Sequence, residues 1–111
     1  MGDAIDLLAL DEIAPERGRI VRAAGREIAL FRDGGQVFAI DDSCPHAGAS
    51  LAGGHFDGRI VTCRAHGLRF HVATGCMVGN PGLKVRSYPA QVLAGRVCVV
   101  IDESESPRNP P

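Results

Sequence analysis

Two short motifs in the middle of the chain combine the residue types that bind transition metals. The first is Cys44-Pro45-His46 and the second is Cys63-Arg64-Ala65-His66, with sixteen residues between His46 and Cys63. Each motif offers one thiol and one imidazole, and each is followed closely by a glycine that lets a loop fold tightly. Together they form a set of two cysteines and two histidines on two similar loops, which is a candidate metal-ligand set.

Three interpretations of this set compete. Chance pairing is disfavoured because the chain has only four cysteines and four histidines. A structural zinc site also takes two cysteines and two histidines, but its common spacing pairs Cys with Cys and places the histidines on a helix. The third interpretation is a [2Fe–2S] cluster in which two cysteines hold one iron and two histidines hold the other. Each loop here contains one cysteine and one histidine, which fits the [2Fe–2S] cluster better than the zinc site.

The four ligand positions make the sequence resemble the Rieske-type ferredoxins, whose pattern is Cys-x-His followed by Cys-x-x-His. This resemblance implies one Rieske [2Fe–2S] cluster, with Cys44 and Cys63 on the inner iron and His46 and His66 on the outer iron. Neutral imidazoles leave the oxidised core uncharged, whereas four thiolates would make it a dianion. Rieske clusters therefore have reduction potentials of roughly −150 to +300 mV, above those of plant-type ferredoxins.

Neighbouring residues predict a potential at the low end of that range. Respiratory-chain Rieske proteins have a disulfide where this chain has Ala49 and Ala65, and hydroxyl donors where it has Leu68 and Phe70. Fewer hydrogen bonds to the cluster leave its reduced state less stabilised. The family often has Trp at the position of Leu68, and this chain has no Trp. Asn80-Pro81-Gly82 resembles the proline-containing loop that covers the cluster in the family.

The resemblance implies an electron carrier rather than an enzyme, with no catalytic residue. It would take single electrons from a flavin-dependent, NADH-oxidising ferredoxin reductase and pass them to the terminal Rieske oxygenase of an aromatic-ring-hydroxylating dioxygenase system. The chain is too short to add the mononuclear iron domain of an oxygenase, and it has no Gly-rich dinucleotide motif. The alternatives are the small Rieske-like subunit of an NADH-dependent nitrite reductase and, in a different class, a zinc-stabilised β binding module.

Length and composition limit the class of protein and the kinds of partner that we expect. The chain has 111 residues and a formal net charge of −1, which fits one domain and argues against a general nucleic-acid binder. Its apolar runs are too short to span a membrane, and its acidic start lacks a basic-then-apolar signal segment. We therefore expect a cytoplasmic monomer without membrane or nucleic-acid partners, whose cysteines are metal ligands or free thiols.

Turn-forming residues divide the chain into short β-prone runs, which predict an all-β fold: a small antiparallel sandwich or barrel with an inserted two-loop cluster-binding subdomain. Residues 3–14 are expected to form a strand that leads into a turn at Asp11–Pro15. Hairpin tips are expected at Ala24-Gly25, Asp33-Gly34-Gly35 and Ala94-Gly95, because glycine accepts a positive φ. The other expected strands are Arg19–Arg22, Glu27–Arg32, Gln36–Ile40, Arg59–Thr62, Val85–Val92 and Arg96–Ile101.

A single Rieske domain is expected over residues 1–102, with its cluster-binding part at about 43–82 and a disordered, Pro-rich tail at 103–111. Cys98 is expected to be buried in an apolar strand, and Cys76 to be partly exposed at a turn. His55 and His71 are expected to be surface or packing residues rather than ligands.

Charge is distributed unevenly along the chain. The stretch from Gly58 to Ile101 holds six basic residues and no acidic ones. This pattern predicts a basic collar around the cluster that orients redox partners. The members of the predicted collar are Arg59, Arg64, Arg69, Lys84, Arg86 and Arg96.

Overall fold

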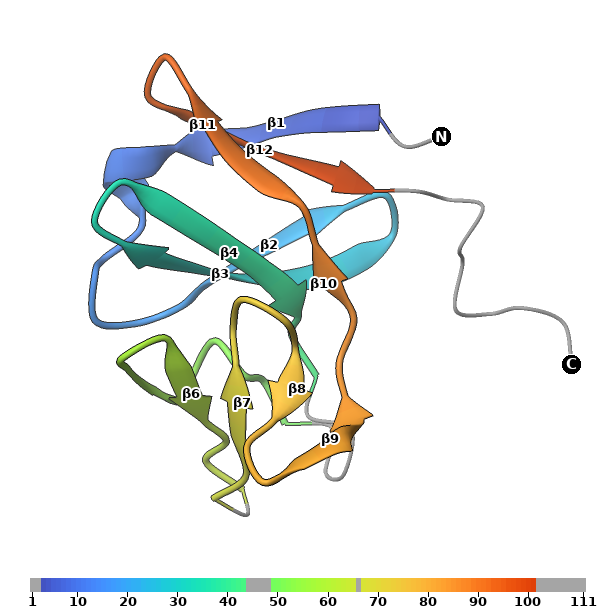
Figure 1. The fold of residues 1–111 in the computed structure, drawn as a ribbon. Coiled ribbons are helices and arrows are strands. Elements are labelled where there is room, and N and C mark those ends of the chain that lie inside the picture. The colour runs from blue at the N-terminus through green and yellow to red at the C-terminus, as the bar shows by residue number, and fades with distance from the viewer. Residues whose placement is uncertain (1–2, 44–48, 66, 102–111) are drawn as a thin grey trace, which may run out of the picture.

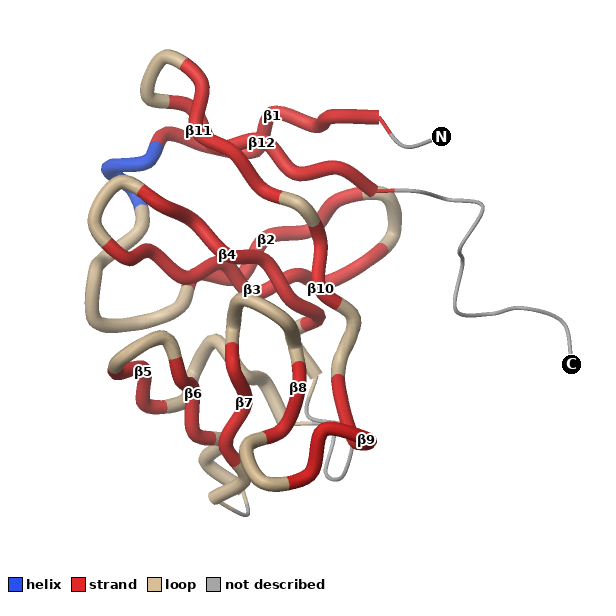
Figure 2. The backbone as a smooth tube through the Cα atoms, viewed as in Figure 1, coloured by secondary structure: helices blue, strands red, loops and turns tan. Residues whose placement is uncertain are grey.

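The computed structural model describes residues 3–43, 49–65 and 67–101 (Figure 1). These ranges contain twelve strands and one short 3-10 helix, η1 (Leu10–Glu12), joined by turns and loops. Figure 2 shows that strands and loops make up nearly all of the described chain. Every pair of neighbouring strands is antiparallel. The predicted all-β antiparallel fold is therefore confirmed. No helix in the described ranges is long and apolar enough to cross a membrane.

The strands form three sheets. The three-stranded sheet has the order β1 (Asp3–Ala9), β12 (Arg96–Ile101) and β11 (Ala90–Leu93). The four-stranded sheet has the order β10 (Ser87–Tyr88), β4 (Gln36–Asp41), β3 (Arg26–Asp33) and β2 (Arg19–Ala23). The five-stranded sheet, in the lower half of Figure 1, has the order β5 (His55–Asp57), β6 (Ile60–Thr62), β7 (Arg69–His71), β8 (Cys76–Met77) and β9 (Asn80–Lys84).

β3 is buried on both faces and lies between two hydrophobic cores. Successive side chains of a strand point to opposite faces, so Ile28 and Leu30 enter one core while Ala29 and Phe31 enter the other. The scaffold core contains Leu8, Ile13, Ile28, Leu30, Val37, Ala39, Tyr88, Val97, Val99 and Ile101. The site core contains Ala29, Phe31, Ile40, Leu51, Ala52, Phe56, Val61, Cys63, Phe70, Val72 and Val85.

The five-stranded sheet is inserted between two strands that lie side by side. β10 pairs with β4 through Ser87 opposite Ile40 and Tyr88 opposite Ala39. The N–H of Asp41 donates to the carbonyl of Arg86 at 2.9 Å, which closes the neck of the insertion. The inserted subdomain expected from the sequence is thus present in the fold. Its limits at 43–82 and the single domain at 1–102 stay predictions, and the tail at 103–111 lies outside the described residues.

The expected strands are confirmed except for Val85–Val92, which is wrong as a single strand. Pro89 separates β10 from β11, and these two strands join different sheets. Proline has no N–H for a sheet ladder, although the carbonyl of Pro89 accepts a hydrogen bond from Val100 at 2.9 Å. β5, β7, β8 and β9 were not predicted from the sequence, and each of them has only two to five residues.

The predicted hairpin tips are confirmed. Ala24 and Gly25 have φ values of 53° and 76°, Ala94 and Gly95 have 51° and 78°, and Gly34 has 63°. Two successive positive φ angles are the geometry of tight two-residue hairpins. The expected strand near the N-terminus is also confirmed as β1, although η1 rather than a simple turn follows it.

The prediction that Cys98 is buried is wrong. β12 alternates, with Val97 and Val99 fully buried and Cys98 half-buried between them. Cys98 therefore points to the opposite face of the strand from the scaffold core.

Candidate functional site

Cys63 is the predicted ligand residue that lies within the described ranges. It follows β6 directly, carries a free thiol, and is 1% exposed within the site core. Cys44, His46 and His66 lie outside the described residues. The structure therefore places one of the four candidate ligands and the chain segments that flank the other three.

The second motif is closed by two hydrogen bonds at its base. The N–H of Cys63 donates to the carbonyl of Leu68 at 2.7 Å, and the N–H of Gly67 donates to the carbonyl of Cys63 at 2.9 Å. Gly67 has a φ of +71°, a conformation that L side chains rarely adopt. These bonds fix the backbone of Cys63 and lead the chain back into β7, so the residue has a rigid backbone from which to present its thiol.

The first motif is flanked by a network around Asp42, which sequence analysis missed. The Asp42 side chain, 5% exposed, accepts hydrogen bonds from the Ser50 hydroxyl at 2.8 and 2.9 Å and from the N–H of Ala52 at 2.8 Å. The carbonyl of Asp42 accepts from the N–H of Leu51 at 3.1 Å. An isolated β-bridge between Ser43 and Ser50 also joins the two ends of the segment that contains the first motif. A buried carboxylate satisfied in this way holds the two ends of the motif together.

The segments that flank the two motifs touch at Gly54. A Cβ on Gly54 would lie 2.2 Å from the carbonyl oxygen of Thr62 and 3.2 Å from a methyl group of Val61. Thr62 directly precedes Cys63, and Gly54 follows the Asp42 network by two residues. The backbone of the first motif's exit therefore lies against the strand that carries the second motif, and only glycine allows that approach.

Residues that the sequence singled out around the motifs lie as follows. Leu68 is half-buried against the site core, and Phe70 is fully buried within it. Neither side chain has a hydroxyl, in agreement with the argument for a low potential. Ala49 is half-buried and Ala65 is exposed. Because both residues are alanine, these positions offer no sulfur for a disulfide between the loops.

The other cysteines and histidines of the described residues are half-buried or exposed. Cys76 is half-buried with a free thiol, as expected. Cys98 is also half-buried with a free thiol, contrary to the prediction that it is buried. His55 and His71 are exposed on β5 and β7, which confirms them as surface residues. Within residues 3–43, 49–65 and 67–101, no group of three or more Cys, His, Asp or Glu side chains gathers as a metal site.

Asn80-Pro81-Gly82, expected to be a turn that covers the cluster, begins strand β9 instead. β9 pairs with β8 through Asn80 opposite Met77 and Lys84 opposite Cys76, with an irregular register between them. The irregularity lets extra residues of β9 bulge away from β8. The covering role of this segment stays a prediction.

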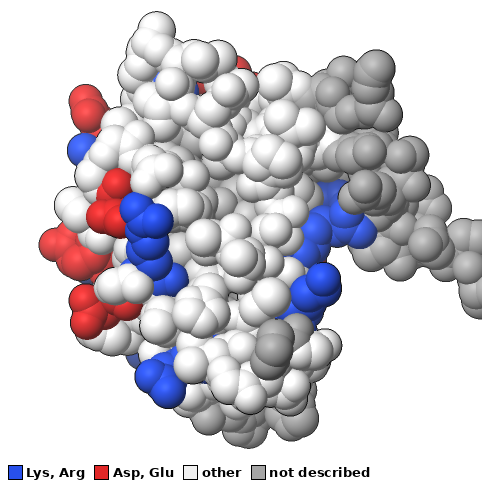
Figure 3. All heavy atoms as spheres, in the orientation of Figure 1, with Lys and Arg blue, Asp and Glu red and all other residues white. Residues whose placement is uncertain are grey.

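The predicted basic collar is wrong at two positions. Arg96 lies in β12 and forms an ion pair with Asp6 at 2.9 Å, in the three-stranded sheet of the scaffold. Arg59 pairs with Asp33 at 2.6 Å, and its guanidinium lies 4.9 Å from the centre of the Phe38 ring. Figure 3 shows the basic side chains of one face as separate groups, one of them beside acidic side chains.

Arg59 connects the five-stranded sheet to the four-stranded sheet of the scaffold through its side-chain contacts. It occupies the β5–β6 turn with a φ of +66°, and it reaches Asp33 and Gln36 at the tip of the β3–β4 hairpin. Its own carbonyl accepts a hydrogen bond from the N–H of Val72 at 3.0 Å. Arg59 therefore has a structural role, and it joins the two halves of the molecule at the edge away from Cys63.

Comparison with known proteins identifies the family. Residues 4–89 match the Rieske [2Fe–2S] domain. The ferredoxin component of the naphthalene 1,2-dioxygenase/salicylate 5-hydroxylase systems of a Ralstonia species is 35% identical over 100 residues, which cover 88% of this chain and 95% of that protein. The chain belongs to the Rieske [2Fe–2S] domain family, and its cofactor is a Rieske-type [2Fe–2S] cluster.

Two solved structures show the same architecture. A protein assigned as the small subunit of an NADH-dependent nitrite reductase from Mycobacterium tuberculosis has a TM-score of 0.85 and 29% identity, over 92% of this chain and 97% of that chain. The ferredoxin in the complex of reduced oxygenase and oxidised ferredoxin of carbazole 1,9a-dioxygenase has a TM-score of 0.77 and 32% identity, over 86% and 91%.

The described part of the site fits such a cluster. Thiolates are the usual protein ligands of iron–sulfur clusters, and Cys63 provides a free thiol on a closed turn. Apolar side chains of the site core surround this position and keep water from it. A hydrophobic environment of this kind is one of the means by which proteins tune a cluster.

Proposed function

We propose that Cys44, His46, Cys63 and His66 hold the [2Fe–2S] cluster. The two thiolates would bind the inner iron and the two imidazoles the outer iron, as the motifs imply. The burial of Cys63 supports this arrangement, because a thiol inside the site core belongs on the side of the cluster that faces the protein. The network of Asp42 and the turn of Cys63 support it as well, since both close the ends of the ligand-bearing segments.

We propose further that the protein is the ferredoxin component of a multicomponent oxygenase system. The observation that carries this proposal is the 35% identity to a dioxygenase-system ferredoxin over 95% of that protein's length. A bound cluster of this type accepts and releases one electron at a time. The chain would receive electrons from a flavin-dependent, NADH-oxidising reductase and deliver them to a terminal Rieske oxygenase, acting as a cytoplasmic monomer.

The burial of Cys63 also supports a direction for electron exchange. The site core closes the side of the site on which Cys63 lies, so a partner would approach from the opposite side, where we expect the imidazoles of His46 and His66. Short distances favour electron transfer, and the protein has to expose one edge of the site while it keeps the rest dry. The apolar residues of the site core around Cys63 keep this side of the site dry.

The proposal is tested by reconstitution with purified partners. The holoprotein, a flavin-dependent reductase and a terminal oxygenase from the same source are combined with NADH and an aromatic substrate. We expect substrate-dependent NADH oxidation that requires the holoprotein and is lost with Cys63→Ser. Failure of the reduced holoprotein to donate electrons to any ring-hydroxylating oxygenase of its source would contradict the proposal.

The small subunit of a nitrite reductase is the second candidate, and the TM-score of 0.85 to the Mycobacterium tuberculosis protein favours it. A subunit of that kind would remain in a permanent complex, whereas a ferredoxin is a free shuttle. Sedimentation of the protein in extracts of its source separates the two. Migration as a free monomer supports the ferredoxin, and co-purification with nitrite-dependent NADH oxidation supports the subunit. Iron and sulfide analysis of the same sample distinguishes both from a zinc-stabilised module.

A further inference from the structure

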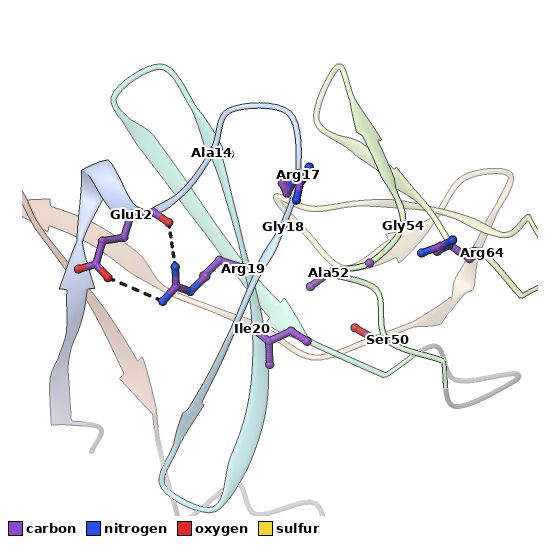
Figure 4. Close-up of a pocket in the computed structure, with 11 residues that line it drawn as sticks. Glu12, Ala14, Arg17, Gly18, Arg19, Ile20, Ser50, Ala52, Gly54 and Arg64 are labelled. Carbon is purple, nitrogen blue, oxygen red and sulfur yellow. Dashed lines mark hydrogen bonds and ion pairs between the residues drawn. The ribbon is translucent and has the colours of Figure 1, made fainter.

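A basic groove lies beside the candidate cluster site. It encloses about 790 Å³ between the segment that leads into β2 and the segment that follows the first motif. Figure 4 shows Arg17 and Arg64 on its two sides, with Ala52 and Gly54 between them. Arg64 is the residue after Cys63, and Ser50 at the groove's edge belongs to the Asp42 network. The groove therefore adjoins the flanks of both ligand motifs.

Two of the three arginines in this groove have no carboxylate partner in the described part of the chain. Arg19 donates to the carbonyl of Glu12 at 3.1 Å and lies 3.7 Å from its carboxylate, so its charge is largely compensated. The side chains of Arg17 and Arg64 form no ion pair or hydrogen bond within the described ranges, and both residues are exposed. The groove thus presents two guanidinium groups that are available to an anionic group from outside.

Backbone contacts give this groove a fixed shape. A Cβ on Gly18 would lie 2.8 Å from the Cα of Ala52 and 2.8 Å from the ring of Phe31, so the Arg17 segment lies directly against the segment that follows the first motif. The stem of Arg64 passes over Gly53, where a Cβ would lie 3.9 Å from its Cδ. Ile20, which also lines the groove, is 49% exposed and adds an apolar contact surface.

We propose that this groove docks an acidic segment of the terminal oxygenase. Guanidinium groups bind carboxylates in a planar, two-bond geometry, and apolar contacts beside such pairs exclude water. Opposite charges across an interface raise the rate of encounter and fix the orientation of the partners. The oxygenase is the chosen occupant because a relative at 32% identity forms a complex with its oxygenase. The inference rests on the proposed function and deepens it by naming the docking site.

The first test uses the terminal oxygenase from the protein's own source, identified by its ability to reoxidise the reduced wild-type protein in extracts. The test measures the rate of electron transfer from the reduced protein to this oxygenase. Purified, reduced holoprotein is mixed with that oxygenase in a stopped-flow instrument over a range of ionic strength. We expect Arg17→Gln and Arg64→Gln each to lower the second-order rate constant about threefold at low salt, and the double variant about tenfold. At high salt the variants and the wild type should converge, because salt screens the attraction.

Two control variants locate the effect. Arg22→Gln removes the same charge from the far end of β2, where Arg22 pairs with Glu27, and its rate should match the wild type. Arg69→Gln removes an exposed arginine of the inserted sheet outside the groove. Unchanged midpoint potentials in all variants would show that the rate effects arise from docking and not from the driving force.

The second test identifies the occupant chemically. Lys84 is the only lysine in the chain, so Lys84→Arg gives a background in which a single new lysine can be introduced. Arg17→Lys or Arg64→Lys in this background should form carbodiimide cross-links to Asp or Glu of the oxygenase, identified by mass spectrometry. Arg22→Lys is the matched control and should form few cross-links.

Several results would overturn the proposal. An equal loss with Arg69→Gln would show that diffuse charge, not the groove, attracts the oxygenase. A slower reduction by the reductase with normal delivery to the oxygenase would assign the groove to the other partner. Normal rates for the double variant would show that the groove takes no part. These results are distinct from failure of the proposed function, in which even the wild type would not reduce the oxygenase.

Discussion

Asp42 accepts a hydrogen bond from the backbone N–H of Ala52 across the two ends of the segment that contains Cys44 and His46. The same carboxylate accepts a hydrogen bond from the hydroxyl of Ser50, so one buried side chain joins the exit of β4 to the segment whose Leu51 and Ala52 belong to the site core with Cys63. A charge buried in this way is stable only with its hydrogen bonds in place. The position of the first ligand motif therefore depends on a residue that is not itself a ligand.

Removal of the Asp42 carboxylate should loosen the first motif. Because Asp42→Ala leaves the N–H of Ala52 and the hydroxyl of Ser50 without their acceptor, we expect a loss of about 2–3 kcal/mol in the free energy of unfolding. Iron content after purification should fall as well. Urea unfolding and iron analysis measure the two effects.

Asp42→Asn and Ser50→Ala are the matched variants for that experiment. Asp42→Asn keeps an oxygen acceptor, and Ser50→Ala removes only one donor, so both should lose less stability than Asp42→Ala. If Asp42→Ala has wild-type stability and full iron content, Asp42 does not hold the motif.

Gly54 and Gly53 should respond very differently to the same substitution. Gly54→Ala places a methyl group 2.2 Å from the Thr62 carbonyl oxygen, so the contact between the flanking segments has to open. Gly53→Ala meets nothing closer than 3.9 Å. We expect Gly54→Ala to purify with little cluster and to unfold at a temperature at least several degrees lower, whereas Gly53→Ala should resemble the wild type. Equal behaviour of the two variants in a thermal melt and in visible absorbance would contradict the close contact.

The neck of the inserted subdomain predicts a stability change at alkaline pH. Burial of Tyr88, together with its hydrogen bond to Asp41, raises its pKa from 10.0 to about 12. A raised pKa means that the folded state favours the protonated phenol, so this stabilisation is complete below pH 10 and is lost as the pH rises through about 12.

Tyr88 is the only tyrosine, and the chain has no tryptophan, so tyrosinate absorbance reports this one group. We expect its titration midpoint near 12 in the folded protein and near 10.0 in urea. Tyr88→Phe should remove this contribution to the alkaline loss of stability. A folded-state midpoint at the urea value would show that the neck does not hold the phenol as described.

The residues around the second motif predict a low reduction potential. Leu68 and Phe70 have no hydroxyl to donate toward the cluster, so we expect a midpoint near the low end of the Rieske range, roughly −150 mV. Leu68→Ser introduces a hydroxyl and should raise the midpoint, because a donor stabilises the reduced state. Leu68→Ala loses the same packing without a hydroxyl and should leave the midpoint close to that of the wild type. A clearly positive midpoint in the wild-type protein would contradict this account.

Sequence patterns predicted the parts of the fold that follow from local chemistry. Ala24 and Gly25 form a hairpin because tight turns need positive φ. The metal-ligand spacing predicted Cys63 as a ligand, and the structure places this residue on a closed turn in the site core, while its role as a ligand stays a prediction. Cys44, His46 and His66 lie outside the described residues and stay predictions. The features that sequence reasoning missed depend on tertiary contacts.

Asp42 illustrates the limit of sequence patterns. In the sequence it is one of two adjacent acidic residues, and nothing local shows that Asp42 is buried while its neighbour faces the Tyr88 hydroxyl. Arg59 and Arg96 looked like members of a collar because their acidic partners, Asp33 and Asp6, are distant in sequence. Contacts between residues that are distant in sequence, within one sheet for Arg96 and between two sheets for Arg59, decide which of these charges are paired.

The most direct test of the central claim is pulsed electron paramagnetic resonance of the reduced protein, with iron and sulfide analysis of the same sample. The account predicts two irons and two sulfides per chain, a Rieske-type signal, and hyperfine coupling to two coordinated nitrogen atoms, from His46 and His66. Substitution of either histidine should abolish that pattern, whereas His55→Ala and His71→Ala should leave it intact. A signal of an all-thiolate cluster without coordinated nitrogen, or a colourless protein that contains zinc, would contradict the account.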